Sequence, residues 1–188
     1  MESTTGLGQS LSAKHDPLTG LPSRRHLHRA LTAGAARAKR SGQGLGVLFL
    51  DLDRFKHIND AHGRSAGDAV LKMCAERFAA TLRESGLIAH ISGDEFVVLI
   101  ERCGEPSAAI AVARKLLDAA GKPILLDGRE VALTASIGIA LYPSDGADGE
   151  TLLQHADIAH FRAKEHGRNN YQFYSAQVNT RTAGRLAA

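Results

Sequence analysis

The spacing of apolar residues changes along the chain, and each spacing predicts a different element. Residues 45–52 form an apolar run bounded by glycine, which is typical of a strand covered on both faces. Shorter apolar runs predict further strands at 87–91, 96–100, 136–140 and 171–174. Because only Ser92-Gly93-Asp94-Glu95 separates the first two of these, they predict a β-hairpin with two carboxylates at its tip.

Helices are predicted wherever apolar residues recur three or four positions apart. The first follows a turn at 16–22, with Pro22 near its first position and with Leu27, Leu31 and Ala35 on one face. Further helices are predicted at 67–82, 107–120 and 150–165. Strands and helices mix without strict alternation, which predicts an α+β class with a mainly antiparallel central sheet flanked by helices.

The chain has 188 residues, the size of one domain, and its 44% hydrophobic and 23% charged residues are ordinary for a globular protein. Residues 1–15 are rich in Ser, Thr and Gly and predict a disordered segment or linker before a domain at 16–174. Residues 175–188 are expected to form a linker helix or tail. No apolar run approaches the ~20 residues that cross a bilayer and no signal peptide is evident, so we expect no membrane segment and a cytoplasmic location.

The net charge of +3 and the pI of about 9.0 would permit an anionic partner. The basic residues are nevertheless spread out, and no basic stripe alternates with aromatic residues, so nucleic-acid binding is not predicted. The two cysteines, Cys74 and Cys103, lie far apart without a CxxC spacing. This pattern argues against a disulfide framework or a zinc site and predicts two structural thiols.

Acidic residues follow two of the predicted strands. Asp51 and Asp53 end the run at 45–52 and, with a period of two, share one face. Asp94 and Glu95 occupy the hairpin tip, so the two acidic pairs would meet at one sheet edge if the hairpin lies beside that strand. Oxygen ligands of this kind suit Mg²⁺ or Mn²⁺, ions that serve phosphoryl and nucleotidyl transfer.

A simpler interpretation has Asp51 and Asp53 capping the next helix, with the tip acids supplying turn chemistry. Each pair, taken alone, favours that interpretation. The two pairs together, each following an apolar strand, favour a metal site, because carboxylates at the end of a buried strand need a compensating cation.

Groups suited to a nucleoside triphosphate surround the acids. Phe55 and Lys56 follow the strand where exposed backbone N–H groups and one cation could meet phosphate. Lys164 and Arg168 lie one helical turn apart near the end of the last predicted helix and could clamp a polyphosphate. The alternative is that both cations only complement the negative end of that helix dipole.

Asn59 and Asp68 combine an amide with a carboxylate, the pair of side-chain types that can read a guanine edge through hydrogen bonds. Alternatively, Asn59 is a turn residue and Asp68 supplies a negative charge near a helix N-terminus. The local sequence leaves both interpretations open.

Several segments together resemble the diguanylate cyclase (GGDEF) family. The matching segments are DPLTGL at 16–21, FLDLDRFKHIND at 49–60, SGDEF at 92–96, SIGIALYP at 136–143 and ADIAHFRAKEHGRN at 156–169. Each motif is moderately specific, but together they follow the family's order and spacing over residues 16–174. The resemblance implies the palm-like fold of nucleotidyl cyclases.

The resemblance also implies roles for individual residues. Metal would be bound by Asp51, the carbonyl of Leu52 and Asp94. Asp94 and Glu95 would be the catalytic pair, one of them near the 3′-hydroxyl that loses its proton. The substrate-binding positions would be Phe55, Lys56, Asn59, Asp68, Ser92, Gly93, Lys164 and Arg168.

In such enzymes two domains face each other, each with one GTP, and each 3′-oxygen attacks the α-phosphorus of the other GTP. The implied function is a diguanylate cyclase that condenses two GTP into cyclic di-GMP and pyrophosphate, with Mg²⁺ or Mn²⁺ as cofactor. A twofold homodimer is implied because the product itself has twofold symmetry.

Several positions depart from the family pattern. Ser92 replaces the first signature glycine, where the backbone passes close to the nucleotide, so its side chain is either harmless or slows turnover. His90 stands where the family usually has arginine, Ser23 replaces the usual asparagine, and His160-Phe161 replaces an apolar-Tyr pair. The metal and guanine positions are all retained, so we expect catalytic competence.

The family's inhibitory product site is an RxxD motif upstream of the signature. Here Arg83 keeps the arginine, but Gly86 replaces the aspartate. Because glycine has no carboxylate to accept hydrogen bonds, we predict that product inhibition through this site is weak or absent.

Two other classes of function fit parts of the sequence. The segment 171–186 resembles the join between a GGDEF domain and a following EAL phosphodiesterase domain, which would make the chain a piece of a longer protein. The alternative function is then a catalytically weak or inactive GTP-binding module that controls an attached C-terminal EAL domain. A nucleic-acid or protein interaction module fits the pI but leaves the acidic cluster unexplained.

Overall fold

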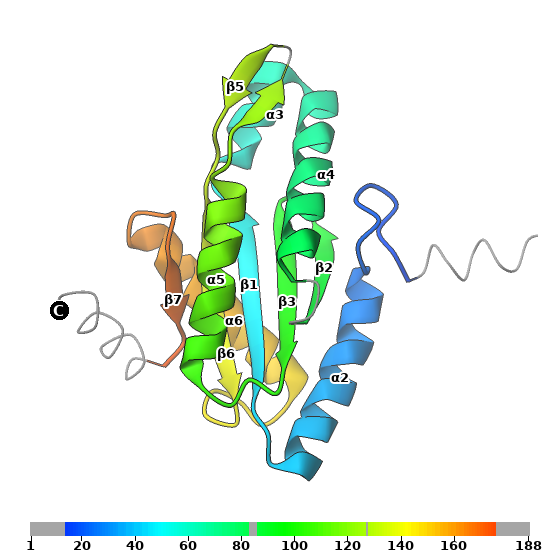
Figure 1. Cartoon of the computed structure of the whole chain (residues 1–188), viewed down its shortest axis with the longest axis vertical. Helices are drawn as coiled ribbons and strands as arrows, with labels where there is room; N and C mark the ends of the chain where they lie inside the picture. Colours follow the sequence, from blue (N-terminus) through cyan, green and yellow to red (C-terminus); the bar gives the residue numbers. More distant parts are fainter. Residues whose placement is uncertain (1–13, 83–85, 127, 176–188) are drawn as a thin grey trace, which may run out of the picture.

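The structure is a computed structural model that describes residues 14–82, 86–126 and 128–175. The predicted N-terminal segment 1–15 and tail 175–188 therefore lie almost entirely outside the described residues. Figure 1 shows a central sheet with helices on both of its faces. Within the described ranges, no helix combines the length and the apolar character needed to cross a membrane.

The central sheet is mainly antiparallel, as the sequence predicts. β1 (Leu45–Leu52) is its middle strand and pairs antiparallel with both neighbours, β3 (Glu95–Glu101) and β6 (Ala135–Tyr142). The edge strands are β2 (Leu87–Ser92), which forms the predicted hairpin with β3, and β7 (Tyr171–Phe173), which runs parallel to β6. Every residue of β1 is buried, because helices cover both faces of the sheet.

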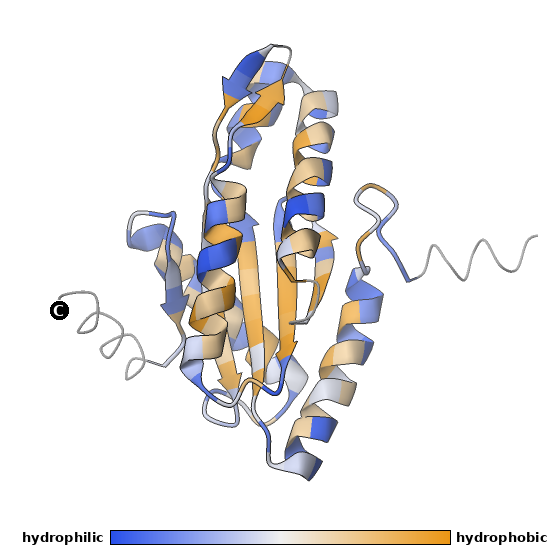
Figure 2. Ribbon diagram, in the orientation of Figure 1, coloured by the Kyte–Doolittle hydropathy of each residue, from blue (hydrophilic) through white to orange (hydrophobic). Residues whose placement is uncertain are grey.

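Two pairs of helices cover the two faces, and each pair has its own hydrophobic core. α4 (Arg64–Thr81) and α5 (Pro106–Ala120) lie in front of the sheet in Figure 1. α2 (Arg24–Ser41) and α6 (Gly149–Glu165) cover the opposite face. Successive side chains of β1 enter the two cores in turn, and Figure 2 shows the hydrophobic residues concentrated on the strands between the helices.

The first helix begins later than predicted, at Arg24 rather than near Pro22. The Ser23 hydroxyl caps α2 by accepting a hydrogen bond from the backbone N–H of His26 at 3.4 Å. Pro22 instead forms an isolated bridge with His15. Serine takes the cap position because its side chain can satisfy a helix N–H, which proline cannot do.

The sequence patterns do not predict α3 (Phe55–His62). Its 8 residues include only one buried side chain, Phe55, so it carries no apolar stripe at helical spacing. Gly63 separates it from α4 with a φ of 82°, a conformation that glycine adopts without strain. α4 therefore starts at Arg64 rather than at 67. A separate small hairpin, β4 (Ile124–Leu126) and β5 (Arg129–Val131), lies near α3 in Figure 1.

Both cysteines are buried and free, which confirms their prediction as structural thiols. Burial raises the pKa of Cys74 to about 11 and also raises the pKa of Cys103. Since the thiolate is the reactive form, these two residues serve packing rather than chemistry.

Candidate active site

The strand pairing places the two acidic segments side by side. In the antiparallel register of β1 and β3, Asp51 lies opposite Glu95. The backbone N–H of Leu52 donates to the carbonyl of Asp94 at 3.2 Å, so the hairpin tip closes over the end of β1. Asp51, Asp94 and Glu95 therefore meet at one edge of the sheet, as expected if the hairpin lies beside the strand.

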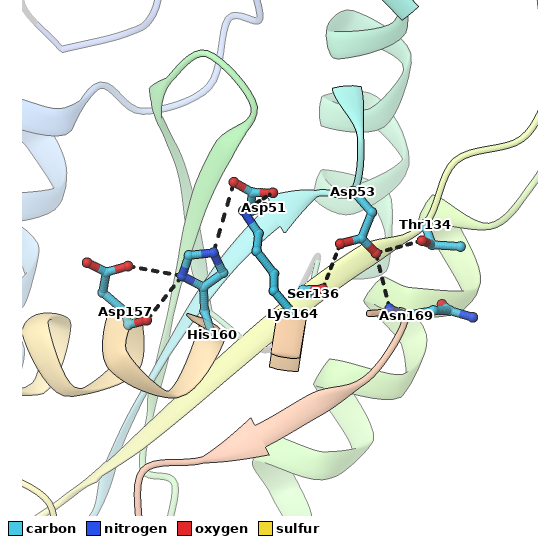
Figure 3. Close-up of polar contacts among 8 residues, drawn as sticks. All are labelled: Asp51, Asp53, Thr134, Ser136, Asp157, His160, Lys164 and Asn169. Atoms are coloured by element: carbon cyan, nitrogen blue, oxygen red, sulfur yellow. Dashed lines mark hydrogen bonds and ion pairs between the residues drawn. The ribbon is translucent and has the colours of Figure 1, made fainter. Parts of the chain in front are cut away.

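Asp51 is the buried member of this acidic group. Its Oδ1 atom lies 2.9 Å from Nζ of Lys164, and its Oδ2 atom lies 4.0 Å from Nε2 of His160 (Figure 3). Burial raises the pKa of the Asp51 carboxyl; the hydrogen bond from Lys164 opposes this rise, and the negative charge of Asp94 adds to it. The two carboxylates are thus close enough for the charge of Asp94 to affect the pKa of Asp51.

The close approach of α6 to the sheet brings these partners to Asp51. A side chain at Gly138 in β6 would place its Cβ 1.9 Å from the carbonyl of Ala156 and 2.1 Å from the backbone nitrogen of His160. Only glycine lets the helix pack this tightly. His160 and Lys164, four residues apart on α6, then project from the same face toward the end of β1.

His160 belongs to this site, although sequence reasoning recorded it only as a departure from the family pattern. Its ring stacks on Phe49 with 4.9 Å between ring centroids. Nδ1 lies 3.0 Å from Oδ1 and 3.1 Å from the carbonyl oxygen of Asp157, both acceptors, so this nitrogen carries a proton. Nε2 is buried without a hydrogen-bond partner and points toward Asp51. The four-residue spacing from Lys164 is the sequence signal that could have identified it.

Asp53 has a different role from Asp51. Its carboxylate accepts hydrogen bonds from the hydroxyls of Thr134 at 2.6 Å and Ser136 at 2.7 Å, and from the backbone N–H of Asn169 at 3.1 Å. Figure 3 shows these bonds joining the end of β1 to β6 and to the loop after α6. Asp53 therefore fixes the framework of the site. Neither acid caps α3, whose N-cap residue is Arg54 and makes no side-chain cap bond.

The backbone around the expected phosphate site is held in an unusual conformation. Arg54, Arg168 and Asn169 have φ values of 57°, 62° and 49°, in the left-handed region that non-glycine residues rarely occupy. Such conformations persist where the surroundings impose them and concentrate at ligand sites. Arg54 is the N-cap residue of α3, whose first turn has no side-chain cap and has Phe55 buried and Lys56 exposed.

Lys164 and Arg168 have different surroundings in this structure, and their joint role as a polyphosphate clamp stays a prediction. Lys164 contacts Asp51, whereas Arg168 is exposed and lines a hollow of about 580 Å³ together with Arg54 and His57. This hollow lies between the start of α3 and the loop after α6. Its lining also includes Asp53, whose carboxylate is hydrogen-bonded, so the two exposed arginines make it suitable for an anionic group.

Asn59 and Asp68 lie on two helices that meet. Asn59 is in α3 rather than in a turn, and a Cβ on Gly67 of α4 would be 1.9 Å from its Oδ1 atom. Gly67, which directly precedes Asp68, therefore leaves room for the Asn59 amide at the contact between α3 and α4. Asp68 is exposed and lies past the first turn of α4, so it is not a helix-terminal charge.

The hairpin tip accommodates serine without backbone strain. Gly93 has a φ of 49°, whereas Ser92 is not among the described residues with a positive φ. The Ser92 hydroxyl donates to Oε2 of Glu95 at 2.7 Å. Serine in place of the first signature glycine thus adds a restraint on the Glu95 carboxylate, next to an irregularity in the pairing of β2 with β3 between His90 and Ser92.

His90 joins the same tip to the N-terminal turn. Its Nδ1 lies 2.9 Å from Oδ1 of Asp16, and its Nε2 lies 2.8 Å from the carbonyl oxygen of Gly93. The ring is buried and packs on Phe96 with 4.8 Å between centroids. Histidine at this position therefore connects the segment at 16–21 to the signature hairpin.

The degenerate inhibitory motif is only partly visible. Arg83 lies outside the described residues. A Cβ on Gly86 would be 2.2 Å from the carbonyl oxygen of Leu99, so this backbone has no space for an aspartate side chain. The weakness of product inhibition through this site stays a prediction.

The residues at the acidic edge fit a divalent ion of the kind expected. Within the part of the chain that the structure describes, no group of three or more His, Cys, Asp or Glu side chains forms a cage for a metal. Two carboxylates and a backbone carbonyl are instead the donor set of Mg²⁺ sites, in which waters and substrate phosphates complete the coordination. Asp51, Asp94 and the Leu52 carbonyl are the groups that would supply that set, and metal binding here stays a prediction.

A mainly antiparallel sheet flanked by helices, with carboxylates meeting where its middle strand adjoins a hairpin, defines the palm-like class of nucleotidyl cyclase folds. Within this class, the chain belongs to the family described as diguanylate cyclase, GGDEF domain, which matches residues 13–170. This confirms the resemblance drawn from the sequence motifs.

Similar proteins include both enzymes and isolated domains. Cyclic di-GMP phosphodiesterase NbdA from Pseudomonas aeruginosa is 41% identical and covers 93% of this chain. The bifunctional diguanylate cyclase/cyclic di-GMP phosphodiesterase MucR from the same species is 43% identical and also covers 93%. A solved structure of the GGDEF domain of TpbB from P. aeruginosa has a TM-score of 0.82 at 40% identity, and the match covers 86% of this chain and 94% of that one.

The chain spans 22% of the length of NbdA and 25% of that of MucR. The names of these relatives include both the synthesis and the hydrolysis of cyclic di-GMP. Their similarity supports a function related to cyclic di-GMP for this chain.

Proposed function

We propose that this chain is a diguanylate cyclase domain that condenses two GTP into cyclic di-GMP and two pyrophosphates. The observation that carries this proposal is the pairing of Asp51 with Glu95, which sets three carboxylates around the end of a buried strand. No structural role of the hairpin requires so much negative charge at one edge, whereas nucleotidyl transfer does.

In this proposal, each side chain has a defined task. Asp51, Asp94 and the Leu52 carbonyl hold Mg²⁺ or Mn²⁺, which neutralises phosphate charge when bound. The uncapped N–H groups at the start of α3, together with Lys56, bind phosphate oxygens. Arg168 and Lys164 supply further positive charge to the triphosphate.

The same proposal assigns guanine recognition to the contact between α3 and α4. The Asn59 amide and the Asp68 carboxylate present donor and acceptor groups that suit the edge of guanine. Their placement on two helices packed through Gly67 gives the pair a fixed separation. Adenine has a different edge pattern, so we expect a preference for GTP over ATP.

The reaction exchanges one bond for another at each phosphorus. The 3′-oxygen of one GTP forms a bond to the α-phosphorus of the other, and the bond from that phosphorus to pyrophosphate breaks. The 3′-proton passes to a carboxylate at the hairpin tip, Asp94 or Glu95. Since one domain positions one nucleotide, two domains must face each other in a twofold homodimer.

A second candidate function is a GTP-binding regulatory module that controls an attached C-terminal EAL domain. It is favoured by the similarity to NbdA, a named phosphodiesterase of which this chain spans 22%. The bond between Ser92 and Glu95, which restrains a group expected to act in catalysis, also favours it.

Incubation of the chain with GTP and Mg²⁺ or Mn²⁺, followed by chromatography, distinguishes the two functions. The proposal expects cyclic di-GMP from the wild type, loss of product for Asp94→Asn, and unchanged product for Asp118→Asn, an exposed acid on α5. Saturable GTP binding without product would support the regulatory module. Absence of GTP binding would overturn both.

A further inference from the structure

Lys164 makes an ion pair with the carboxylate that is expected to bind metal. Its Nζ lies 2.9 Å from Oδ1 of Asp51, with the Asp51 side chain 9% exposed and the Lys164 side chain 29% exposed. Figure 3 shows Lys164 reaching from α6 across to the end of β1. In this arrangement the lysine is the counter-ion of a buried acid.

Asp51 needs such a counter-ion because burial and the nearby charge of Asp94 both disfavour its ionised form. A divalent ion at the same carboxylate would supply the compensation that Lys164 now supplies. The ammonium and the divalent ion would then lie within a few ångströms of each other in a site of low dielectric, where like charges repel strongly.

His160 is not free to exchange partners in the same way. Its ring is buried, stacked on Phe49 and fixed through Nδ1 by two acceptors of Asp157. Its Nε2 is 4.0 Å from Asp51, beyond hydrogen-bond distance. Lys164 is partly exposed and has a long flexible side chain, so it is the partner that can move.

We propose that Lys164 exchanges between Asp51 and the triphosphate, and that this exchange couples metal binding to nucleotide binding. A divalent ion arriving alone must displace Lys164 from Asp51 while the lysine has no other anion nearby. A bound triphosphate offers Lys164 a second anionic partner and so frees Asp51 for the ion. This inference rests on the proposed nucleotide site and names Lys164 as its coupling residue.

The coupling must be reciprocal. If the nucleotide raises the affinity for metal by some factor, the metal raises the affinity for the nucleotide by the same factor. Removal of the Lys164 charge should therefore strengthen metal binding in the absence of nucleotide and reduce the further gain that nucleotide provides.

The expected gain in metal affinity without nucleotide can be measured on the full chain. Electron paramagnetic resonance of free Mn²⁺ reports how much of the ion is bound. We expect Lys164→Met to bind Mn²⁺ about tenfold more tightly than the wild type, which is an ordinary size for such coupling. Lys115→Met removes the same charge from an exposed position on α5, which covers the face of the sheet opposite α6, and it should stay within about twofold of the wild type. Lys164→Arg keeps the charge and should also stay close to the wild type.

Repeating the titration with a non-hydrolysable GTP analogue tests whether removal of the Lys164 charge reduces the further gain in metal affinity that nucleotide provides. The analogue should tighten Mn²⁺ binding more in the wild type than in Lys164→Met. Equal Mn²⁺ affinity in the wild type and Lys164→Met, or equal tightening by Lys115→Met, would overturn the inference. So would tight binding that persists when Asp51→Asn is added to Lys164→Met.

Circular-dichroism melting checks that each variant is folded, and Lys164→Gln replaces Lys164→Met if the latter is not. The Mn²⁺ titrations can fail or succeed independently of the test for cyclic di-GMP formation. If the wild type makes no cyclic di-GMP but Lys164→Met binds Mn²⁺ more tightly than the wild type does, the cyclase proposal is wrong and the exchange of Lys164 is supported. If the wild type makes cyclic di-GMP but Lys164→Met leaves the Mn²⁺ affinity unchanged, the cyclase proposal is supported and the exchange of Lys164 is wrong.

Discussion

His90 Nδ1 lies 2.9 Å from Oδ1 of Asp16, and this contact ties the N-terminal turn to the signature hairpin. The other ring nitrogen of His90 meets the carbonyl of Gly93 at 2.8 Å. Both ring nitrogens of His90 therefore have a polar partner inside the fold. A buried ring with two polar partners is costly to remove, because each partner is left without its bond.

We therefore expect His90→Ala to lower the free energy of unfolding by about 2 kcal/mol. The matched control is His57→Ala, since His57 is exposed. Urea denaturation of both variants measures the difference. Equal stabilities of the two variants would show that the bridge from Asp16 to Gly93 contributes little.

The pH dependence of stability offers a second test of the same contact. Burial alone would raise the pKa of Asp16, but hydrogen bonds from His90 and Thr19 bring it below its ordinary value. An acid with a lowered folded-state pKa contributes stability above its unfolded pKa and loses it as pH falls through the folded value. The wild type should therefore lose stability below about pH 4 more steeply than Asp16→Asn does, as measured by thermal melting across pH.

Much of the framework follows from the sequence because burial on both faces leaves a plain signal. β1 is apolar along its length except at Asp51, and its bounds match the prediction at 45–52. α3 was not predictable in the same way, because a short helix with one buried residue has no periodic stripe. Its existence depends on Gly63 and on packing against α4.

The partners of the acids could not be predicted from local patterns. Asp51 and Asp53 lie two residues apart at the end of the same strand, yet Asp51 contacts Lys164 whereas Asp53 accepts hydrogen bonds from Thr134 and Ser136. That difference is set by the register of β6 and by the close approach of α6, both of which are long-range features. The convergence of the acids was predictable because a hairpin beside the strand has few alternative placements.

The stability of the fold should change in opposite directions when Asp51 and Asp53 are each replaced by asparagine. The pKa of Asp51 is raised in the folded state, so the fold favours the protonated form of this acid. Its contribution to stability is therefore complete below the unfolded pKa and is lost as pH rises through the folded pKa. Asp51→Asn should therefore melt about 2 °C above the wild type at neutral pH, and the gain should vanish below about pH 4.

Asp53→Asn should destabilise the fold by about 2 kcal/mol, because an amide cannot accept all the hydrogen bonds that the carboxylate now receives. Thermal melting of the two asparagine variants side by side gives the comparison. If Asp51→Asn instead melts below the wild type at neutral pH, the ion pair with Lys164 outweighs the cost of burying the acid.

Ser92 provides a test of how firmly the hairpin tip holds Glu95. Loss of the hydroxyl frees the Glu95 carboxylate from a 2.7 Å hydrogen bond, so we expect the turnover of Ser92→Gly to rise about threefold, the size of one net hydrogen bond. Ser92→Ala removes the same bond without adding the backbone freedom of glycine. Equal rises in both variants, measured as cyclic di-GMP formed, would identify the hydroxyl as the cause. A rise in Ser92→Gly alone would assign the effect to the backbone instead.

Gly86 decides whether the inhibitory motif can be restored by one substitution. Any side chain there would place its Cβ 2.2 Å from the Leu99 carbonyl, a backbone group that cannot rotate away. We expect Gly86→Asp to lose about 2 kcal/mol of stability, as substitutions that force a backbone shift do, and to gain no affinity for cyclic di-GMP. Calorimetric titration and urea denaturation measure the two effects. Tight product binding in the wild type that disappears in Arg83→Ala would show that the motif works without its acid, whereas tight binding that appears only in Gly86→Asp would show that β3 can yield at Leu99.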